Sequence, residues 1–138
     1  MLLQRLITIG VLLVVVAGTA AGEQAATVSS KQAAAFMGNW VFDMTSPAEL
    51  IGTQETVRIW EKDGFVAASV QVAKFPPNDV TGVLRDRDLL MLSTTLRENG
   101  QPIWVVISLK IQGETMMLAQ MMELSSTIKR GIGKKQAN

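Results

Sequence analysis

Carboxylates are the main candidates for acid–base chemistry in this sequence, because it contains neither histidine nor cysteine. Without an imidazole or a thiol, the chain has no Ser-His-Asp triad, no thiol nucleophile, no histidine ligand for haem and no ordinary zinc site. Asp86 and Asp88 are close in sequence, but they alternate with Arg85 and Arg87. This alternation favours a solvated salt-bridge cluster over a catalytic pair. The composition therefore predicts a protein that is not an enzyme and that uses no metal and no cofactor.

Methionine is the second feature with chemical meaning. Met116, Met117, Met121 and Met122 lie in one apolar segment, and Met91 lies in another. The flexible, polarisable thioether suits a pocket for apolar ligands of variable shape, but it also fills gaps in a solid core. Both interpretations stay open, because the interior of a small β-barrel holds either side chains or one small ligand.

The N-terminal residues have the charge and size order of a secretory signal peptide. Arg5 is followed by an uncharged apolar run and then by small residues up to Gly22. We therefore expect a signal peptide over 1–22, a flexible leader over 23–30, a folded domain over 31–133 and a basic tail over 134–138. Export to the periplasm or secretion follows from this prediction. The alternative is an uncleaved anchor, since the uncharged run is close to the lower limit of about 17 residues for spanning a bilayer.

Net charge argues against nucleic acid as a partner. Removal of 1–22 takes away Arg5 and leaves 12 basic and 12 acidic residues, whereas phosphate binding needs a basic face. Membrane contact is expected only through the signal segment or weakly through the basic end of the chain. With no cysteine to form disulfides, a hydrophobic core must hold the domain together.

Turn signals divide the rest of the chain into hairpins. A short helix is expected over 31–37, capped by Ser29 or Ser30 and ended by Gly38. Strands follow near 39–45, 54–61, 65–73, 80–85, 89–96, 102–111, 114–122 and 126–132. Asp63-Gly64 and Asn99-Gly100 are two-residue type I′ turn signals, and they predict the pairs Ile59 with Ala68 and Leu92 with Ile107.

Alternation along these strands sorts side chains to two faces. A turn at Gln112-Gly113 would turn Met116, Leu118, Gln120 and Met122 inward, opposite Leu109, Ile107, Val105 and Ile103. The same register turns Trp104, Met117, Met121 and their neighbours outward. An outward apolar band of this size is unusual on a monomer. It predicts a homodimer contact, a surface for a partner such as an envelope protein, or proximity to a membrane, unless the two faces are wrongly assigned or a two-layer fold buries both.

The strand count predicts an all-β fold. Eight antiparallel strands with short connections and one apolar face favour an up-and-down barrel with a short N-terminal helix, and a two-layer sandwich is the alternative. Trp40 begins the first strand and would point inward with Phe42 to close one end of the barrel.

With its short helix, Phe36-x-Gly38-x-Trp40, eight-strand meander and late basic residue, the sequence resembles the lipocalin-like (calycin) superfamily. The resemblance implies a barrel in which Trp40 closes one end after the close turn at Gly38. It also implies that a late arginine packs across the tryptophan, which nominates Arg130, with Lys129 as the other candidate. The common disulfides of secreted lipocalins are absent, and the loop after the first strand is short.

Two hypotheses of function follow. The first is an exported, non-enzymatic protein that binds a small apolar or amphipathic molecule in the barrel. Its cavity would be lined by Trp40, Phe42, Val57, Ile59, Val70, Leu92, Val105, Ile107, Leu118, Gln120 and Met122. The second is a structural or interaction module with a filled core, such as an inhibitor or envelope partner. It would act through the outward band of Met91, Trp104, Val106, Met117 and Met121.

Overall fold

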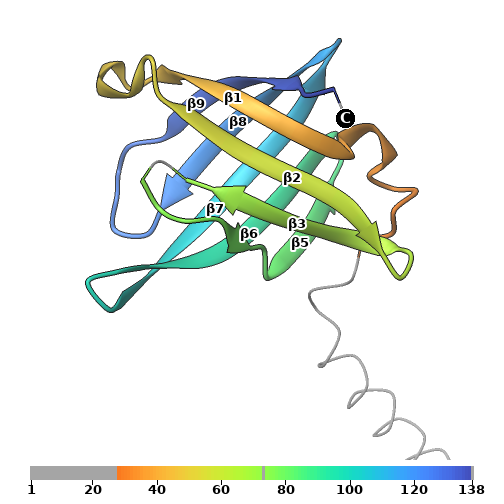
Figure 1. Ribbon diagram of the computed structural model, residues 1–138, viewed down its shortest axis with the longest axis horizontal. Coiled ribbons are helices and arrows are strands. Elements are labelled where there is room, and N and C mark those ends of the chain that lie inside the picture. Colours follow the sequence, from red (N-terminus) through yellow and green to blue (C-terminus); the bar gives the residue numbers. More distant parts are fainter. Residues whose placement is uncertain (1–27, 73, 138) are drawn as a thin grey trace, which may run out of the picture.

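The strands form one continuous antiparallel meander (Figure 1). The computed structural model describes residues 28–72 and 74–137, so the predicted signal peptide lies outside the described residues. The nine strands are β1 Gly38–Ser46, β2 Gln54–Lys62, β3 Phe65–Gln71, β4 Asn78–Asp79, β5 Gly82–Asp86, β6 Leu89–Glu98, β7 Gln101–Gln112, β8 Thr115–Met122 and β9 Lys129–Lys135. Two 3-10 turns, η2 Ala34–Phe36 and η3 Ala48–Leu50, flank β1, and no α-helix occurs in the described ranges.

The two Gly-containing hairpins have the register that the sequence predicts. Asp63 and Gly64 have φ values of 54° and 85°, and Asn99 and Gly100 have values of 52° and 78°. Positive φ at both loop residues defines the type I′ turn, whose twist matches that of the flanking strands. Ile59 consequently pairs with Ala68, and Leu92 pairs with Ile107.

The next hairpin is shifted by two residues from its predicted register. Gln112 pairs with Thr115, so the loop is Gly113-Glu114 and not Gln112-Gly113. Gly113 has a φ of 62° and takes the first loop position, which is the place of glycine in a type II′ turn. Because the shift is even, Leu118 and Gln120 keep the predicted face but lie opposite Leu109 and Ile107.

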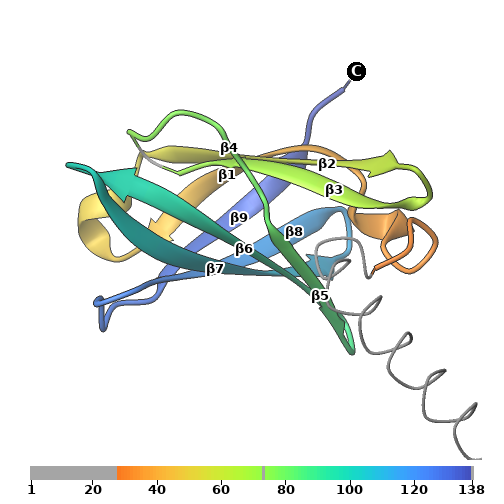
Figure 2. The same cartoon turned by 90° about the horizontal axis from the view of Figure 1, so that it is seen from below.

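The sheet does not close into the predicted eight-stranded barrel. Its strand order is β4-β3-β2-β1-β9-β8-β7-β6-β5, which leaves β4 and β5 at its two ends. The extra strand β4 follows Pro76 and Pro77, which lack the N–H that a ladder needs. The chain then crosses from the β3 side to the β6 side, as Figure 2 shows.

Side-chain and backbone hydrogen bonds bridge this gap in the sheet. The side-chain amide of Asn78 donates to the carbonyl of Thr95 at 3.0 Å and also to the hydroxyl of Thr94. The Val80 N–H donates to the Ala68 carbonyl, and the Thr81 N–H donates to the Ser93 carbonyl, both at 2.9 Å. Residues 78–81 therefore form a strap between β3 and β6.

The N-terminal segment pairs with β3, on one side of the gap in the sheet. The Val66 N–H on β3 donates to the Val28 carbonyl at 2.9 Å, and Val28 is buried. The last residues of the predicted leader are thus part of the fold. In place of the helix predicted over 31–37, the structure has only the 3-10 turn η2. The segment is too short for more, because the residue that pairs with β3 lies only a few residues before the start of β1. None of the described helices is long and apolar enough to cross a membrane.

Strand β9 lies three residues later than predicted. It runs through Lys135, so Lys134 and Lys135 belong to the sheet and not to a tail. The register places Lys135 opposite Trp40, and the Gln136 N–H donates to the Asn39 carbonyl at 2.7 Å. Strand β1 therefore pairs with β2 on one side and with β9 on the other.

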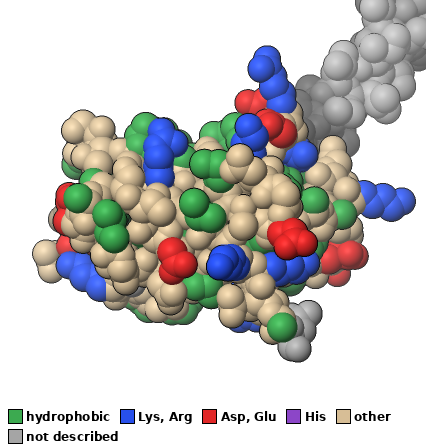
Figure 3. All heavy atoms as spheres, turned by 90° about the horizontal axis from the view of Figure 1, so that it is seen from above, with side chains coloured by type: hydrophobic (Ala, Val, Ile, Leu, Met, Phe, Trp, Pro, Cys, Tyr) green, Lys and Arg blue, Asp and Glu red, His purple; other side chains and the backbone are tan. Residues whose placement is uncertain are grey.

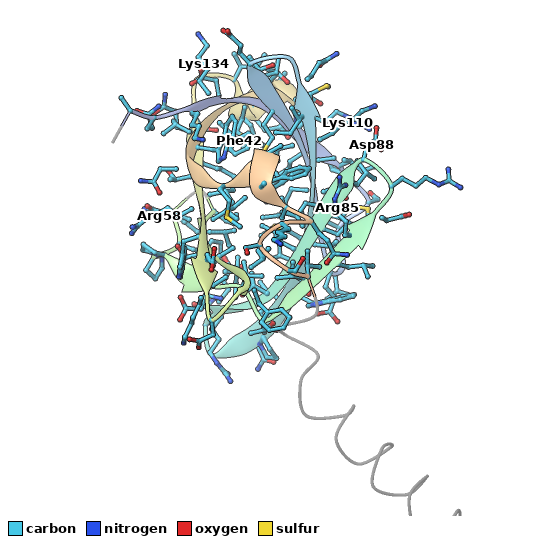
Figure 4. All side chains as sticks on the ribbon, turned by 90° about the vertical axis from the view of Figure 1, so that its right-hand side faces the viewer. Phe42, Arg58, Arg85, Asp88, Lys110 and Lys134 are labelled. Carbon is cyan, nitrogen blue, oxygen red and sulfur yellow. The ribbon has the colours of Figure 1, made fainter. Side chains whose placement is uncertain are left out.

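Side chains fill the interior of the barrel-like sheet. Phe42 and Met44 point inward and are almost fully buried, and Figure 4 shows Phe42 inside the ring of strands. They pack directly on the backbone of β9. A Cβ added at Gly133 would lie 2.5 Å from the Phe42 ring, and one at Gly131 would lie 2.8 Å from the Met44 sulfur. The two glycines therefore make room for the largest core side chains.

Candidate functional site

Trp40 lies buried at one end of the barrel-like sheet, which we call the floor. Its ring is 4% exposed, and its indole Nε1–H donates to the Phe36 carbonyl at 2.9 Å. The Lys135 Nζ lies 5.9 Å from the centre of the Trp40 ring. The cation that packs on the tryptophan is therefore Lys135, whereas Arg130 is exposed and lies in register with Ser46 and Ala119.

A second cation ties the floor to strand β5. The Arg85 guanidinium lies 5.1 Å from the centre of the Phe36 ring, and its Nε donates to the Gln32 carbonyl at 3.2 Å. Arg85 thus has a structural role between η2 and β5. The neighbouring Asp88 forms an ion pair with Lys110 at 3.4 Å, and both side chains are more than half exposed.

Outside the core, charged side chains of both signs are dispersed (Figure 3). Among the described residues, no group of three or more aspartates or glutamates is arranged to hold a metal ion.

The structure brings the predicted ligand-binding residues together in one core. Trp40, Phe42, Val57, Ile59, Val70, Leu92, Val105, Ile107, Leu118 and Gln120 are all buried, and Met122 is half-buried at one end. These side chains touch through the middle of the barrel, so much of the predicted cavity is occupied by the residues that were expected to line it.

Gln120 is one of three polar side chains that are buried among the described residues, together with Glu55 and Thr94. Its side chain is 0% exposed, and neither its amide nitrogen nor its carbonyl oxygen has a hydrogen-bond partner among the described residues. Its cross-strand neighbours are Ile107 and Lys129. A buried amide left unpaired costs about 1–3 kcal/mol, so such a group is normally satisfied by a water molecule or a ligand.

A hollow opens at the end of the barrel opposite the floor, and we call it the mouth pocket. Its volume is about 400 Å³, and it is lined by Lys74, Phe75, Glu98, Ile103, Met122, Glu123, Ser125 and Lys129. Lys74 forms an ion pair with Glu98 at 3.5 Å. The Lys129 Nζ lies 3.7 Å from the Met122 sulfur, and no carboxylate is within ion-pair distance of Lys129 in the part of the chain that the structure describes.

Some residues of this site carry no signal in the sequence. Lys74 and Phe75 lie in the turn before Pro76, where no strand pattern assigns a face. Glu55, which does not line the mouth pocket, was also not predicted as buried; it lies on β2 opposite Phe42 and is 3% exposed. Its position two residues before Val57 could have placed it on the inner face.

The outward band lies where the sequence predicts. Trp104, Met117 and Met121 are 55%, 38% and 50% exposed, and Met91 and Val106 are half-buried. A hollow of about 610 Å³ lies on this side of the sheet. It is lined by Thr81, Gly82, Val83, Leu84, Met91, Leu92, Ser93, Trp104, Val106 and Met121.

Comparisons with known proteins give only distant likenesses. No protein-family model matches the chain, and no curated protein matches it. Among solved structures, a "REP1-NXSQ fatty acid transporter" has a TM-score of 0.44 and 10% identity, over 76% of this chain and 98% of that chain. A "secretary abundant heat soluble (SAHS) protein" from Ramazzottius varieornatus has a TM-score of 0.40 and 12% identity, over 73% of this chain and 95% of that chain.

These likenesses are too distant to carry an argument about function. The fold rests on the strand order and register described above. The antiparallel meander, with Trp40 on its first strand, fits the predicted resemblance to the lipocalin-like superfamily.

Proposed function

We propose that this protein is an exported, non-enzymatic binding protein for a small apolar or amphipathic molecule held in the mouth pocket. The observation that carries the proposal is Gln120, whose fully buried amide has no partner among the described residues. An amide offers two donors and an acceptor, so it can bind a hydroxyl, carbonyl or carboxyl group of a ligand.

The neighbours of Gln120 connect it to the mouth pocket. Met122 follows it on the inner face of β8, and Lys129 pairs with it across to β9. Both residues line the mouth pocket. A ligand that displaces the contact between Lys129 and Met122 would therefore reach the Gln120 amide.

The lining favours a molecule with an apolar body. Phe75, Ile103 and Met122 supply apolar surface, and the flexible thioether can adapt to different shapes. Because Phe42 and Met44 fill the interior nearer the floor, the ligand would occupy the mouth and not the whole barrel. A pocket of a few hundred Å³ suits a ligand of modest size.

The Gln120→Leu variant tests this function. Leucine has a similar volume but no polar atoms, so we expect at least a tenfold weaker affinity for 1-anilinonaphthalene-8-sulfonate, an amphipathic probe, with stability equal to or above that of the wild type. Fluorescence titration measures the affinity, and urea unfolding measures the stability. The matched control is Gln101→Leu, which changes an exposed glutamine on β7.

Unchanged probe affinity in a folded Gln120→Leu variant would contradict the proposal. Native mass spectrometry of the protein purified from its own source adds an independent measurement. A reproducible added mass that is lost on denaturation is expected, and its loss in Gln120→Leu would assign it to this site.

A further inference from the structure

One cation at the mouth pocket has no anionic partner in the part of the chain that the structure describes. The Lys129 side chain is half-buried, and its Nζ lies 3.7 Å from the Met122 sulfur. None of the ion pairs among the described residues includes it. A thioether is only a weak acceptor, so Met122 does not replace the counter-ion that a partly desolvated ammonium needs. Lys129 is therefore positioned to pair with an anion that enters the mouth.

Lys129 points into the barrel, on the same side as Gln120. Side chains of residues that pair across antiparallel strands lie on one face of the sheet, with Cβ atoms about 4.5–5.5 Å apart. Lys129 pairs with the fully buried Gln120, whereas the next residue, Arg130, is exposed. The ammonium and the amide, neither of which has a suitable partner among the described residues, thus lie next to each other where β8 and β9 reach the mouth.

The other charged side chains of the mouth pocket already have partners. Lys74 forms its ion pair with Glu98, and the Glu123 carboxylate accepts a hydrogen bond from the Trp104 N–H at 3.1 Å. The buried carboxylate of Glu55 does not line this pocket. A single cation is thus left for a ligand. The two glutamates at the opening would repel a second negative charge, so the headgroup that fits here carries one.

The positions of the apolar and polar groups set the orientation of the ligand. Phe75, Ile103 and Met122 line the pocket itself, whereas Gln120 is fully enclosed and is not part of the lining. A headgroup that reaches the amide therefore lies at the inner end of the pocket. The apolar body of the same molecule then lies against the three apolar side chains, toward the opening.

We propose that the ligand of the mouth pocket is an amphiphile with one carboxylate, which is held between the Lys129 ammonium and the Gln120 amide. This inference rests on the proposed function and names the class of its ligand. A carboxylate has two oxygens, so one can accept a hydrogen bond from the ammonium while the other accepts one from the amide N–H. An alcohol of the same length would leave Lys129 without a counter-ion. Lys129 is therefore the residue that determines specificity for an acid.

Two ligands with the same ten-carbon chain provide the test. Decanoate and 1-decanol compete with N-phenyl-1-naphthylamine, an uncharged fluorescent probe, at pH 7.5, where a carboxyl group with a pKa of about 4–5 is ionised. The variant is Lys129→Met, which keeps a long side chain but removes the charge. The matched control is Lys134→Met, which removes an exposed charge from the outward face of the same strand.

The wild-type protein is expected to bind decanoate at least tenfold more tightly than 1-decanol, because a hydrogen bond to a charged group is worth about a factor of ten or more in affinity. In Lys129→Met the two affinities should agree within about twofold, while the affinity for the uncharged probe stays unchanged. Lys134→Met should keep the wild-type preference. If Lys129→Met does not fold, Lys129→Gln makes the same comparison with a shorter uncharged side chain.

Equal competition by decanoate and 1-decanol in the wild-type protein would overturn this inference, and so would a preference for decanoate that survives in Lys129→Met. The proposed function stands in both cases if the uncharged probe binds and Gln120→Leu weakens its binding. A wild-type protein that does not bind the uncharged probe, or a Gln120→Leu variant that binds it normally, would instead overturn the proposed function and this inference together.

Discussion

At the scale of single residues, polar atoms inside the barrel fall into two groups. The Trp40 indole nitrogen is paired with a backbone carbonyl, whereas the Gln120 amide has no partner among the described residues. The first arrangement stabilises the floor, and the second is the observation on which the proposed binding at the mouth rests. The two ends of one core thus differ in how their polar atoms are paired.

The cation on Trp40 gives the residue-scale prediction. Lys135→Met removes an ammonium from the ring face, and we expect the free energy of unfolding to fall by about 0.5–1 kcal/mol, as for other exposed cation–π pairs. Urea unfolding measures the change. Arg130→Met is the matched control on the same strand and should be nearly neutral. A larger loss from Arg130→Met than from Lys135→Met would reverse the assignment.

The sequence located the inner-face residues but not their partners at the floor. Strict alternation around Asp63-Gly64 and Asn99-Gly100 set two registers correctly. The resemblance nominated Arg130 as the cation on Trp40, with Lys129 as the other candidate, because the family has a late arginine there. No turn signal marks the boundaries of the last strand. A three-residue shift of that strand brings Lys135 to Trp40 instead. Neither the pairing state of Gln120 nor the hollow beside Phe75 can be read from the sequence, since both depend on packing between distant strands.

At the scale of elements, β9 is a strand whose backbone the core packs against directly. Gly131 and Gly133 have no side chain, so Met44 and Phe42 lie directly against the strand. The glycines are interpreted as part of core packing and not as turn residues. This explains a strand in which Ile132 is the single β-branched residue.

Substitution of Gly133 tests this packing. Gly133→Ala places a Cβ within 2.5 Å of the Phe42 ring, and we expect a loss of about 1–3 kcal/mol in the free energy of unfolding from overpacking. Denaturant titration measures it. In the Phe42→Leu background the same change should cost much less, because the clashing ring atoms are gone. An equal cost in both backgrounds would point to backbone strain and not to the Phe42 contact.

At the scale of the whole molecule, the incomplete closure of the sheet is the main departure from the predicted barrel. Pro76 and Pro77 mark where strand pairing stops, but the sequence does not show that the next residues cross to β6. Closure there depends on the side chain of Asn78 and on a few backbone bonds. The gap is therefore the weakest part of the sheet.

Asn78→Ala tests the strap. Loss of its bonds to Thr94 and Thr95 should lower the free energy of unfolding by about 1–2 kcal/mol. Hydrogen exchange should increase first in β4 and the facing part of β6, while β1 and β9 keep their protection. Asp79→Asn, at the exposed next position, is the control. Uniform loss of protection across all strands would show that the strap does not open independently.

The place of β1 between β2 and β9 has a consequence for the order of folding. The first strand of the chain receives its second neighbour only when the last strand is available. Until then, β1 and β8 each have an unpaired edge, and unpaired edges attract other chains. A polypeptide emerging from a ribosome could not complete this fold before residue 135 appeared. Two edges of the growing sheet thus stay open until β9 is available, and the sheet is completed only at that point.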